Sequence, residues 1–164
     1  MSAEGPARGA NLPSPGAAQR REPQAGGARA IADFDAAIDA AAALPDAPAA
    51  ARAMLDLAED VLTQWVETRG EVPTTDTREG FRLLALHRQG AQDLPSFNAC
   101  RETCREIAYH YNLLGLEPAN EASAQRQRMM AMLVRHLVLF VGGKMEVEGL
   151  GEFCCASRPL RLES

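Results

Sequence analysis

Two cysteines four residues apart, Cys100 and Cys104, are the residues of this chain whose type and spacing most directly indicate chemistry. On a helix, side chains four residues apart share one face, with their β-carbons about 5–6 Å apart. Thiolates at that spacing can occupy two positions of a tetrahedral zinc site or of a Cu(I) site. An arginine follows each cysteine, and a neighbouring positive charge lowers the pKa of an exposed thiol and promotes its oxidation. The pair is therefore a candidate metal or redox site.

Two further cysteines, Cys154 and Cys155, follow much later in the sequence and can complete a set of four sulfur ligands. Adjacent cysteines are awkward joint ligands, because neighbours in an extended segment point to opposite faces. The long gap to the first pair is also not a recognised zinc spacing. The metal-site hypothesis therefore consists of zinc, or another thiophilic metal, held by Cys100, Cys104, Cys154 and Cys155.

The competing interpretation places the first pair in a hydrophobic core. Six residues recur at intervals of 3, 4, 3, 4 and 3, namely Phe97, Cys100, Cys104, Ile107, Tyr111 and Leu114. This spacing is typical of the apolar seam of a packing helix, and a free cysteine behaves there as a small buried hydrophobe. We favour this interpretation, in which the arginines that follow the cysteines point to solvent and no cofactor is bound.

The histidines add little to a metal centre. His110 lies one helical turn after Glu106, and two ligands without a third make only a weak site, so we expect a solvated ion pair. His87 falls in the last turn before Gly90, where a histidine can interact with the terminal carbonyls of its own helix.

Amphipathic helices are predicted to position these residues. The first carries a narrow apolar stripe, which consists of Ile31, Phe34, Ile38 and Ala41. The second covers residues 47–69, begins after a capping residue, Asp46, and ends at Gly70. This second helix is the most clearly marked element in the sequence.

The next two helices flank the cysteine segment. Asp76 with Glu79 three residues later resembles a capping box, so a third helix is expected from there to Gly90. A fourth helix is predicted over residues 96–114, behind Ser96.

A fifth helix is predicted between Asn120, which would cap it, and the pair Gly142–Gly143, which would end it. This helix is apolar over much of its circumference, so we expect it at the centre of the bundle. After it the pattern changes to short alternation around Met145, broken by glycines, which fits a hairpin or an irregular tail.

The fold class that follows is all-α, a bundle of four to five antiparallel helices with a short irregular or hairpin C-terminal tail. Residues 1–27 are rich in Gly, Pro, Ala and Arg and are predicted to be a disordered tail. Residues 28–143 form the bundle in this scheme, and residues 144–164 form a tail packed on it.

Composition limits the setting and the partners. The 164 residues are enough for one domain with a core, and a net charge of −5 gives no drive toward nucleic acid or anionic membranes. The longest apolar stretch is interrupted by Arg135 and His136 and is too short to span a membrane. No secretory signal is visible, so we expect a cytoplasmic protein with reduced thiols.

No common catalytic signature occurs in the sequence. It contains no glycine-rich phosphate loop, no H-E-x-x-H zinc helix and no G-x-S-x-G elbow. We therefore expect a non-enzymatic regulatory, adaptor or accessory protein that acts through protein–protein contacts, with a protein partner or by self-association through its fifth helix. The alternative is a thiol-based metal-binding or redox-sensing protein that uses Cys100 and Cys104 with Cys154 and Cys155.

Overall fold

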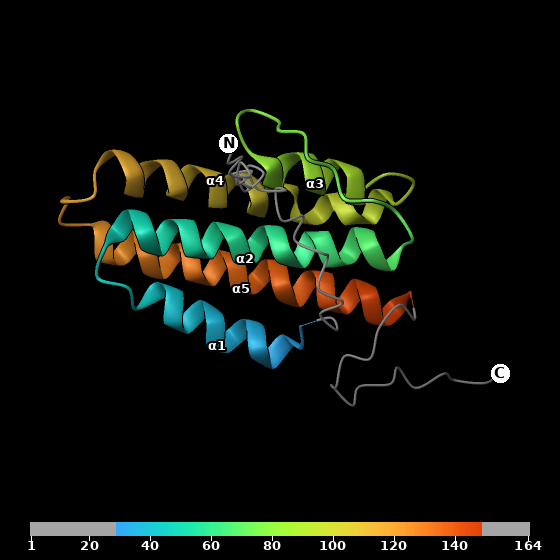
Figure 1. Ribbon diagram of the computed structural model, residues 1–164, viewed down its shortest axis with the longest axis horizontal. Coiled ribbons are helices and arrows are strands. Elements are labelled where there is room, and N and C mark those ends of the chain that lie inside the picture. Colours follow the sequence, from blue (N-terminus) through green and yellow to red (C-terminus); the bar gives the residue numbers. More distant parts are fainter. Residues whose placement is uncertain (1–28, 149–164) are drawn as a thin grey trace, which may run out of the picture.

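The computed structural model describes residues 29–148, and these residues form a bundle of α-helices whose connections are short, apart from a longer loop over residues 69–81 (Figure 1). The helices are α1 (Ile31–Ala42), α2 (Ala47–Thr68), α3 (Arg82–Gly90), the 3₁₀-helix η1 (Pro95–Cys100), α4 (Arg101–Leu116) and α5 (Ser123–Val147). Within this range there is no β-strand, and the predicted all-α class is confirmed. None of these helices combines the length and the apolar character that crossing a membrane requires.

The helix α2 begins and ends where the sequence predicts. A carboxylate oxygen of Asp46 accepts a hydrogen bond of 2.9 Å from the backbone N–H of Ala49, which satisfies one of the free donors of the first turn. At the other end Gly70 has a φ of 79°, a left-handed conformation that favours glycine. Its N–H and that of Glu71 bond back to carbonyls of the last turn, at 2.9 and 3.2 Å.

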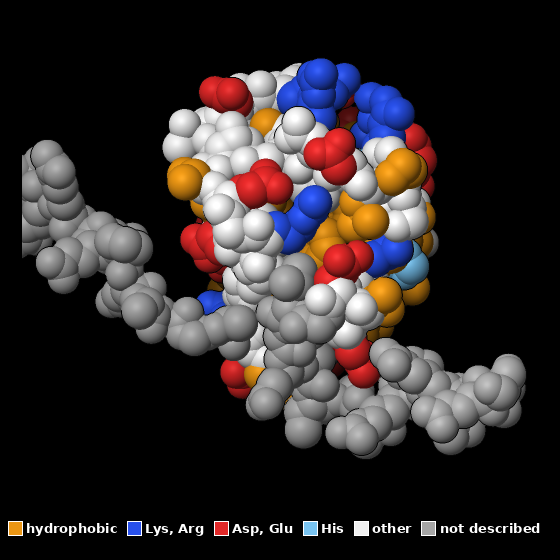
Figure 2. All heavy atoms as spheres, turned by 90° about the vertical axis from the view of Figure 1, so that its right-hand side faces the viewer, with side chains coloured by type: hydrophobic (Ala, Val, Ile, Leu, Met, Phe, Trp, Pro, Cys, Tyr) orange, Lys and Arg blue, Asp and Glu red, His pale blue; other side chains and the backbone are white. Residues whose placement is uncertain are grey.

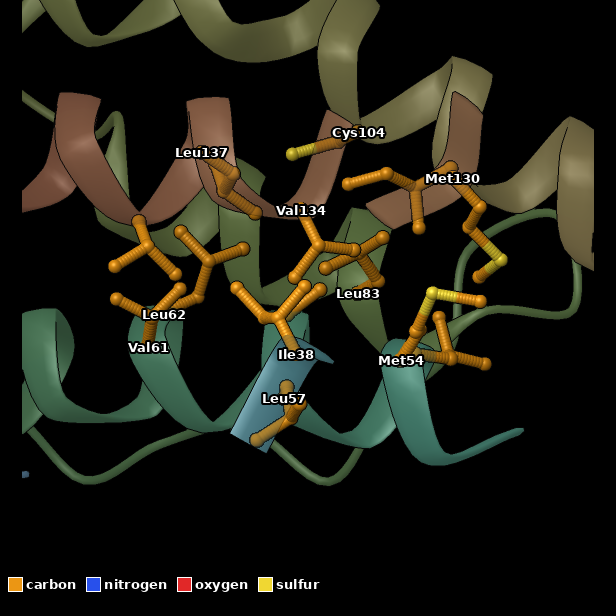
Figure 3. Close-up of a cluster of buried hydrophobic side chains, with 14 of the residues drawn as sticks. Ile38, Met54, Leu57, Val61, Leu62, Leu83, Cys104, Met130, Val134 and Leu137 are labelled. Carbon is orange, nitrogen blue, oxygen red and sulfur yellow. The ribbon is translucent and has the colours of Figure 1, made fainter. Parts of the chain in front are cut away.

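The helices α2 and α5 together form the centre of the bundle. The helix α5 packs against α1, α2 and α4, and in Figure 1 it runs alongside α2 with α1 on one side and α4 on the other. Figure 3 shows the layer in which its Val134 and Leu137 lie among side chains of α1 and α2. The fully buried large side chains of the bundle include Trp65, Phe34, Phe97, Ile38, Met54, Leu62, Leu83, Leu86, Ile107, Leu114, Met130 and Leu137. The expected central position of the fifth helix is confirmed.

The predicted capping box that begins at Asp76 is wrong. Arg78 and Phe81 exchange two backbone hydrogen bonds, of 3.0 and 2.9 Å, and so close a tight turn. The residues at the centre of the turn, Glu79 and Gly80, have φ angles of 53° and 85°. Two consecutive left-handed residues belong to a type I′ turn and cannot start a helix, so α3 begins only after the turn.

The predicted start of the fourth helix is also wrong. Residues 95–100 form η1, because the N–H of Phe97 bonds to the carbonyl of Leu94 three residues back, at 2.9 Å. The α-helix starts at Arg101, and Ser96 makes no cap. The hydroxyl of Ser96 instead accepts a hydrogen bond of 2.9 Å from Nζ of Lys144, which ties η1 to α5.

The fifth helix differs from its prediction at both ends. The side-chain oxygen of Asn120 accepts a 2.8 Å hydrogen bond from the N–H of Ala122, so Asn120 closes a turn before the helix rather than capping it. The pair Gly142–Gly143 does not stop α5, because neither glycine has the positive φ of a helix end. The buried side chain of Met145, one turn further on, keeps the helix packed on the core.

The predicted tail over residues 144–164 therefore begins inside α5, which continues to Val147. The hairpin proposed around Met145 is wrong, since Met145 lies on the buried face of a helix. The remaining predictions for the two ends of the chain, a disordered segment over residues 1–27 and a tail that contains Cys154 and Cys155, lie outside the described residues.

Candidate functional site

The seam predicted for the cysteine segment is confirmed. Cys100 and Cys104 each have 0% of their surface exposed. Cys100 is the last residue of η1 and Cys104 lies in the first turn of α4. Figure 3 shows Cys104 among the buried hydrophobic side chains of the core. The two cysteines are thus core residues by position, whatever chemistry they also perform.

A histidine that the sequence did not connect with the cysteines lies beside them. His87 of α3 is 5% exposed, and its Nε2 lies 3.3 Å from the backbone oxygen of Phe97. The Sγ of Cys100 lies 3.3 Å from the same oxygen. The imidazole and the Cys100 thiol therefore share one hydrogen-bond acceptor.

The prediction that His87 interacts with the terminal carbonyls of its own helix is wrong. Its ring stacks on Phe97, with the ring centroids 5.7 Å apart. One signal for this position was present in the sequence. Leu83, His87 and Gly90 recur at four- and three-residue spacing and share the buried face of α3.

Hydrogen bonding between the two thiols shifts their pKa values in opposite directions. The pKa of Cys100 is lowered to about 6, chiefly because Cys104 donates a hydrogen bond to its sulfur; burial opposes this shift and His87 adds to it. The pKa of Cys104 is raised well above its usual range by the same pairing and by burial. One pairing thus makes Cys100 the more acidic and Cys104 the less acidic of the two thiols.

The metal-site hypothesis is not tested by these residues. Across residues 29–148, no three His, Cys, Asp or Glu side chains gather closely enough to hold a metal ion. Two of the four proposed ligands, Cys154 and Cys155, lie outside that range. A zinc site that uses them together with Cys100 and Cys104 stays a prediction.

The ion pair predicted between Glu106 and His110 is not formed in the described part of the chain. Nδ1 of His110 is buried, with no hydrogen-bond partner among these residues. Burial lowers the pKa of His110, and Glu106 opposes that shift only in part. His110 is therefore a neutral ring on the flank of α4 rather than half of a salt bridge.

A surface hollow of about 910 Å³ lies between the loop over residues 74–79, α3 and the start of α4. His87 contributes to its wall. Four arginines and two carboxylates also line it, and we call it the arginine hollow: Arg78, Arg88, Arg101, Arg105, Asp76 and Glu79. In Figure 2 basic side chains gather along the upper edge of this end of the molecule, the edge that α3 and its preceding loop occupy in Figure 1.

The loop that forms one wall of the hollow is fixed by side chains of α3. The amide oxygen of Gln89 accepts a 2.8 Å hydrogen bond from the N–H of Thr74, and its amide nitrogen donates one of 2.8 Å to the carbonyl of Val72. Nε of Arg82 donates a further bond of 2.9 Å to the carbonyl of Thr74. The hollow is therefore a preformed feature of the fold.

A second surface stands out on α5. The helix carries exposed residues at intervals of 3, 4, 3, 4 and 4, which we call the outer face of α5: Met129, Met132, His136, Leu139, Gly143 and Val147. Met132 is 61% exposed and Leu139 is 54% exposed. Large apolar side chains that recur at helical spacing on a surface are typical of a contact with another helix.

The described residues thus contain two features able to support a function, the thiol pair with its hollow and the outer face of α5. Comparison of the chain with known protein families, with curated proteins and with solved structures finds no match.

Proposed function

We propose that this chain is a non-enzymatic regulatory or adaptor protein that acts through protein–protein contacts, and that its outer face of α5 binds a second copy of the chain. One observation carries the proposal. Exposed residues spaced for helix packing extend from Met129 to Val147, about 27 Å at 1.5 Å per residue. That length is comparable to the contact of two helices in a small coiled coil.

The outer face is complementary in size to itself. Consider two α5 helices packed antiparallel, with the two-fold axis level with the peptide bond between Leu137 and Val138. In this pair Met132 of one copy faces Gly143 of the other. A side chain at Gly143 would meet nothing within 4 Å, so the flexible Met132 of a partner copy has room there. Two-fold symmetry makes this contact twice, as an isologous interface requires.

The outer face is also complementary in charge to itself. Arg128 is exposed near the N-terminal end of the face, and Glu146 is exposed near its C-terminal end. In the same antiparallel pair each arginine meets the glutamate of the other copy. A parallel arrangement would place like charges side by side, which disfavours it.

Sedimentation equilibrium over a range of concentrations tests this proposal. We expect a monomer–dimer equilibrium in the wild-type chain, and monomers in the variants Met132→Glu and Leu139→Glu, whose side chains are solvent-exposed. Leu116→Glu is the matched control, since Leu116 is an exposed leucine on another helix and this variant is expected to dimerise normally. A wild-type chain that stays monomeric at millimolar concentration would contradict the proposal.

A second candidate function, thiol-based redox sensing, is supported by the position of Cys100 and Cys104 one helical turn apart in one seam, together with the lowered pKa of Cys100. Because both thiols are buried, it requires a local opening that admits the oxidant. In this scheme the Cys100 thiolate attacks hydrogen peroxide, the O–O bond breaks, and a sulfenic acid and water form after protonation. The Cys104 thiol then attacks that sulfur, a disulfide forms and a second water leaves. Two thiols lose two electrons in total, and the peroxide gains them.

Mass spectrometry after hydrogen peroxide treatment tests the redox scheme. The wild-type chain is expected to lose two hydrogen atoms between Cys100 and Cys104, and Cys104→Ser is expected to accumulate a sulfenic acid on Cys100. Thiols that stay reduced in the folded protein would exclude it. Metal analysis of the full chain, with Cys104→Ser as the comparison, tests the zinc alternative.

A further inference from the structure

We propose that the arginine hollow binds a small molecule carrying at least two adjacent phosphate groups. This inference does not rest on the proposed self-association, because the hollow is formed by α3, α4 and their connections rather than by the outer face of α5. The charge of the lining favours an anionic ligand. Four arginines and only two carboxylates line the hollow, in a chain whose net charge is −5. A local excess of positive charge in a concave site attracts anions.

The arginines of the hollow are largely uncommitted. Arg105 makes an ion pair with Glu79, with the nitrogen and oxygen 3.4 Å apart. The guanidinium groups of Arg78, Arg88 and Arg101 make no ion pair or hydrogen bond with the side chains of residues 29–148. Three forks of N–H donors are therefore available to a ligand.

The arginines of α4 are held at a fixed spacing. Arg101 and Arg105 lie four residues apart on one helix, so their side chains leave the same face about 5–6 Å apart. The opposite wall is held on α3 by Gln89, as described above. A site whose walls are already ordered loses little conformational entropy on binding, which favours affinity.

The chemistry of the lining selects the class of ligand. A guanidinium group matches the geometry of a phosphate with two parallel N–H···O bonds. The lining is otherwise mostly polar, and its apolar residues are Leu84, Ala85 and Ala91. An apolar ligand would therefore leave polar groups without partners. A volume of about 910 Å³ exceeds the need of a single phosphate and accommodates a diphosphate with an attached group.

Isothermal titration of the full chain with inorganic pyrophosphate, at fixed ionic strength, tests the inference. We expect saturable binding at one site per chain. In the double variant Arg88→Gln/Arg101→Gln the affinity is expected to fall by about a hundredfold, since each lost charge-assisted interaction contributes about tenfold. Both side chains are exposed, so the fold is expected to persist, and the thermal unfolding midpoint checks this.

Two controls make the titration decisive. Arg52→Gln removes an exposed arginine outside the hollow, and its affinity for pyrophosphate is expected to stay within twofold of the wild type. Citrate, a carboxylate polyanion, is expected to bind at least tenfold more weakly. Equal losses in the Arg52→Gln and hollow variants, citrate binding as tight as pyrophosphate binding, or no saturable binding would each overturn the proposal.

Discussion

The indole Nε1 of Trp65 donates a hydrogen bond of 2.9 Å to the carbonyl of Gly90, which ties α2 to the last residue of α3. A guanidinium nitrogen of Arg69 donates to the same carbonyl at 3.0 Å. Trp65 also stacks on Phe97, with ring centroids 4.8 Å apart. One aromatic residue of α2 therefore fixes both the end of α3 and the start of the cysteine segment.

Gly90→Ala is predicted to destabilise the fold by about 1–3 kcal/mol, because the new β-carbon would lie 2.7 Å from Cδ1 of Trp65. Gly115→Ala is the matched control. A β-carbon there meets nothing within 4 Å, so the higher helix propensity of alanine is expected to be neutral or stabilising. Denaturant unfolding followed by the fluorescence of the single tryptophan measures both. Equal stabilities of the two variants would refute the tight packing at Gly90.

Asp46→Ala is predicted to lower the free energy of unfolding by about 1 kcal/mol, because it removes the hydrogen bond to the N–H of Ala49. Asp76→Ala is the comparison, since the sequence marks both residues as caps but Asp76 begins no helix. It is expected to change stability by less than about 0.5 kcal/mol. Chemical denaturation distinguishes the two, and a larger loss in Asp76→Ala would contradict the turn described before α3.

Charge reversal at the two ends of the outer face of α5 is predicted to weaken dimerisation. Arg128→Glu and Glu146→Arg each place like charges together in the proposed antiparallel pair, whereas the double variant restores attraction. Sedimentation equilibrium at low salt is the measurement. A double variant as weak as the single variants would exclude the antiparallel register.

The stability of the wild-type chain is predicted to rise with pH between about 6 and 8. The folded pKa of Cys100 is about 6, below its ordinary value, so the unfolded state binds more protons in this range. The contribution is complete above the ordinary thiol pKa and is lost as the pH falls through 6. The slope is at most about 1.4 kcal/mol per pH unit.

Urea unfolding of the wild type and of Cys100→Ser across this pH range measures the thiol contribution. The rise with pH is expected to be absent in Cys100→Ser and reduced in Cys104→Ala, which removes the hydrogen-bond donor. Identical slopes in the wild type and Cys100→Ser would show that no thiolate is stabilised at Cys100.

Gln89→Leu is predicted to release the loop that forms one wall of the arginine hollow, because Gln89 makes two hydrogen bonds to its backbone. Trypsin is then expected to cleave after the exposed Arg78 several times faster than in the wild type. Gln92→Leu is the control. The backbone oxygen of Gln92 accepts hydrogen bonds from Arg69, and the substitution leaves that oxygen in place. Similar cleavage rates in both variants would count against the anchoring role of Gln89.

Local sequence patterns correctly predicted the features that depend only on residues close together in the chain. The seam through Cys100 and Cys104 and the cap at Asp46 rest on local patterns, and the structure contains both. The predicted helix starts at Asp76 and Ser96 failed for a physical reason. Backbone conformation at Glu79 and hydrogen bonding within η1 override the preferences of single capping residues.

The neighbours of the cysteines were less accessible to sequence reasoning. His87 and Cys100 come from different helices, and only the packing of α3 against η1 brings them to one carbonyl. The hollow likewise combines arginines from a loop, α3 and α4. Contacts between elements depend on how the helices cross, which a single sequence does not state.

The central place of α5 also has a consequence for synthesis on the ribosome. Arg135 of α5 bonds to Asp35 of α1 across 100 residues of chain, and α5 covers faces of α1, α2 and α4. These faces stay open to water until the segment up to Val147 has left the exit tunnel, because α5 is made after the helices that it covers. We therefore expect the nascent chain to bind chaperones until α5 has emerged, with the bundle completed only afterwards.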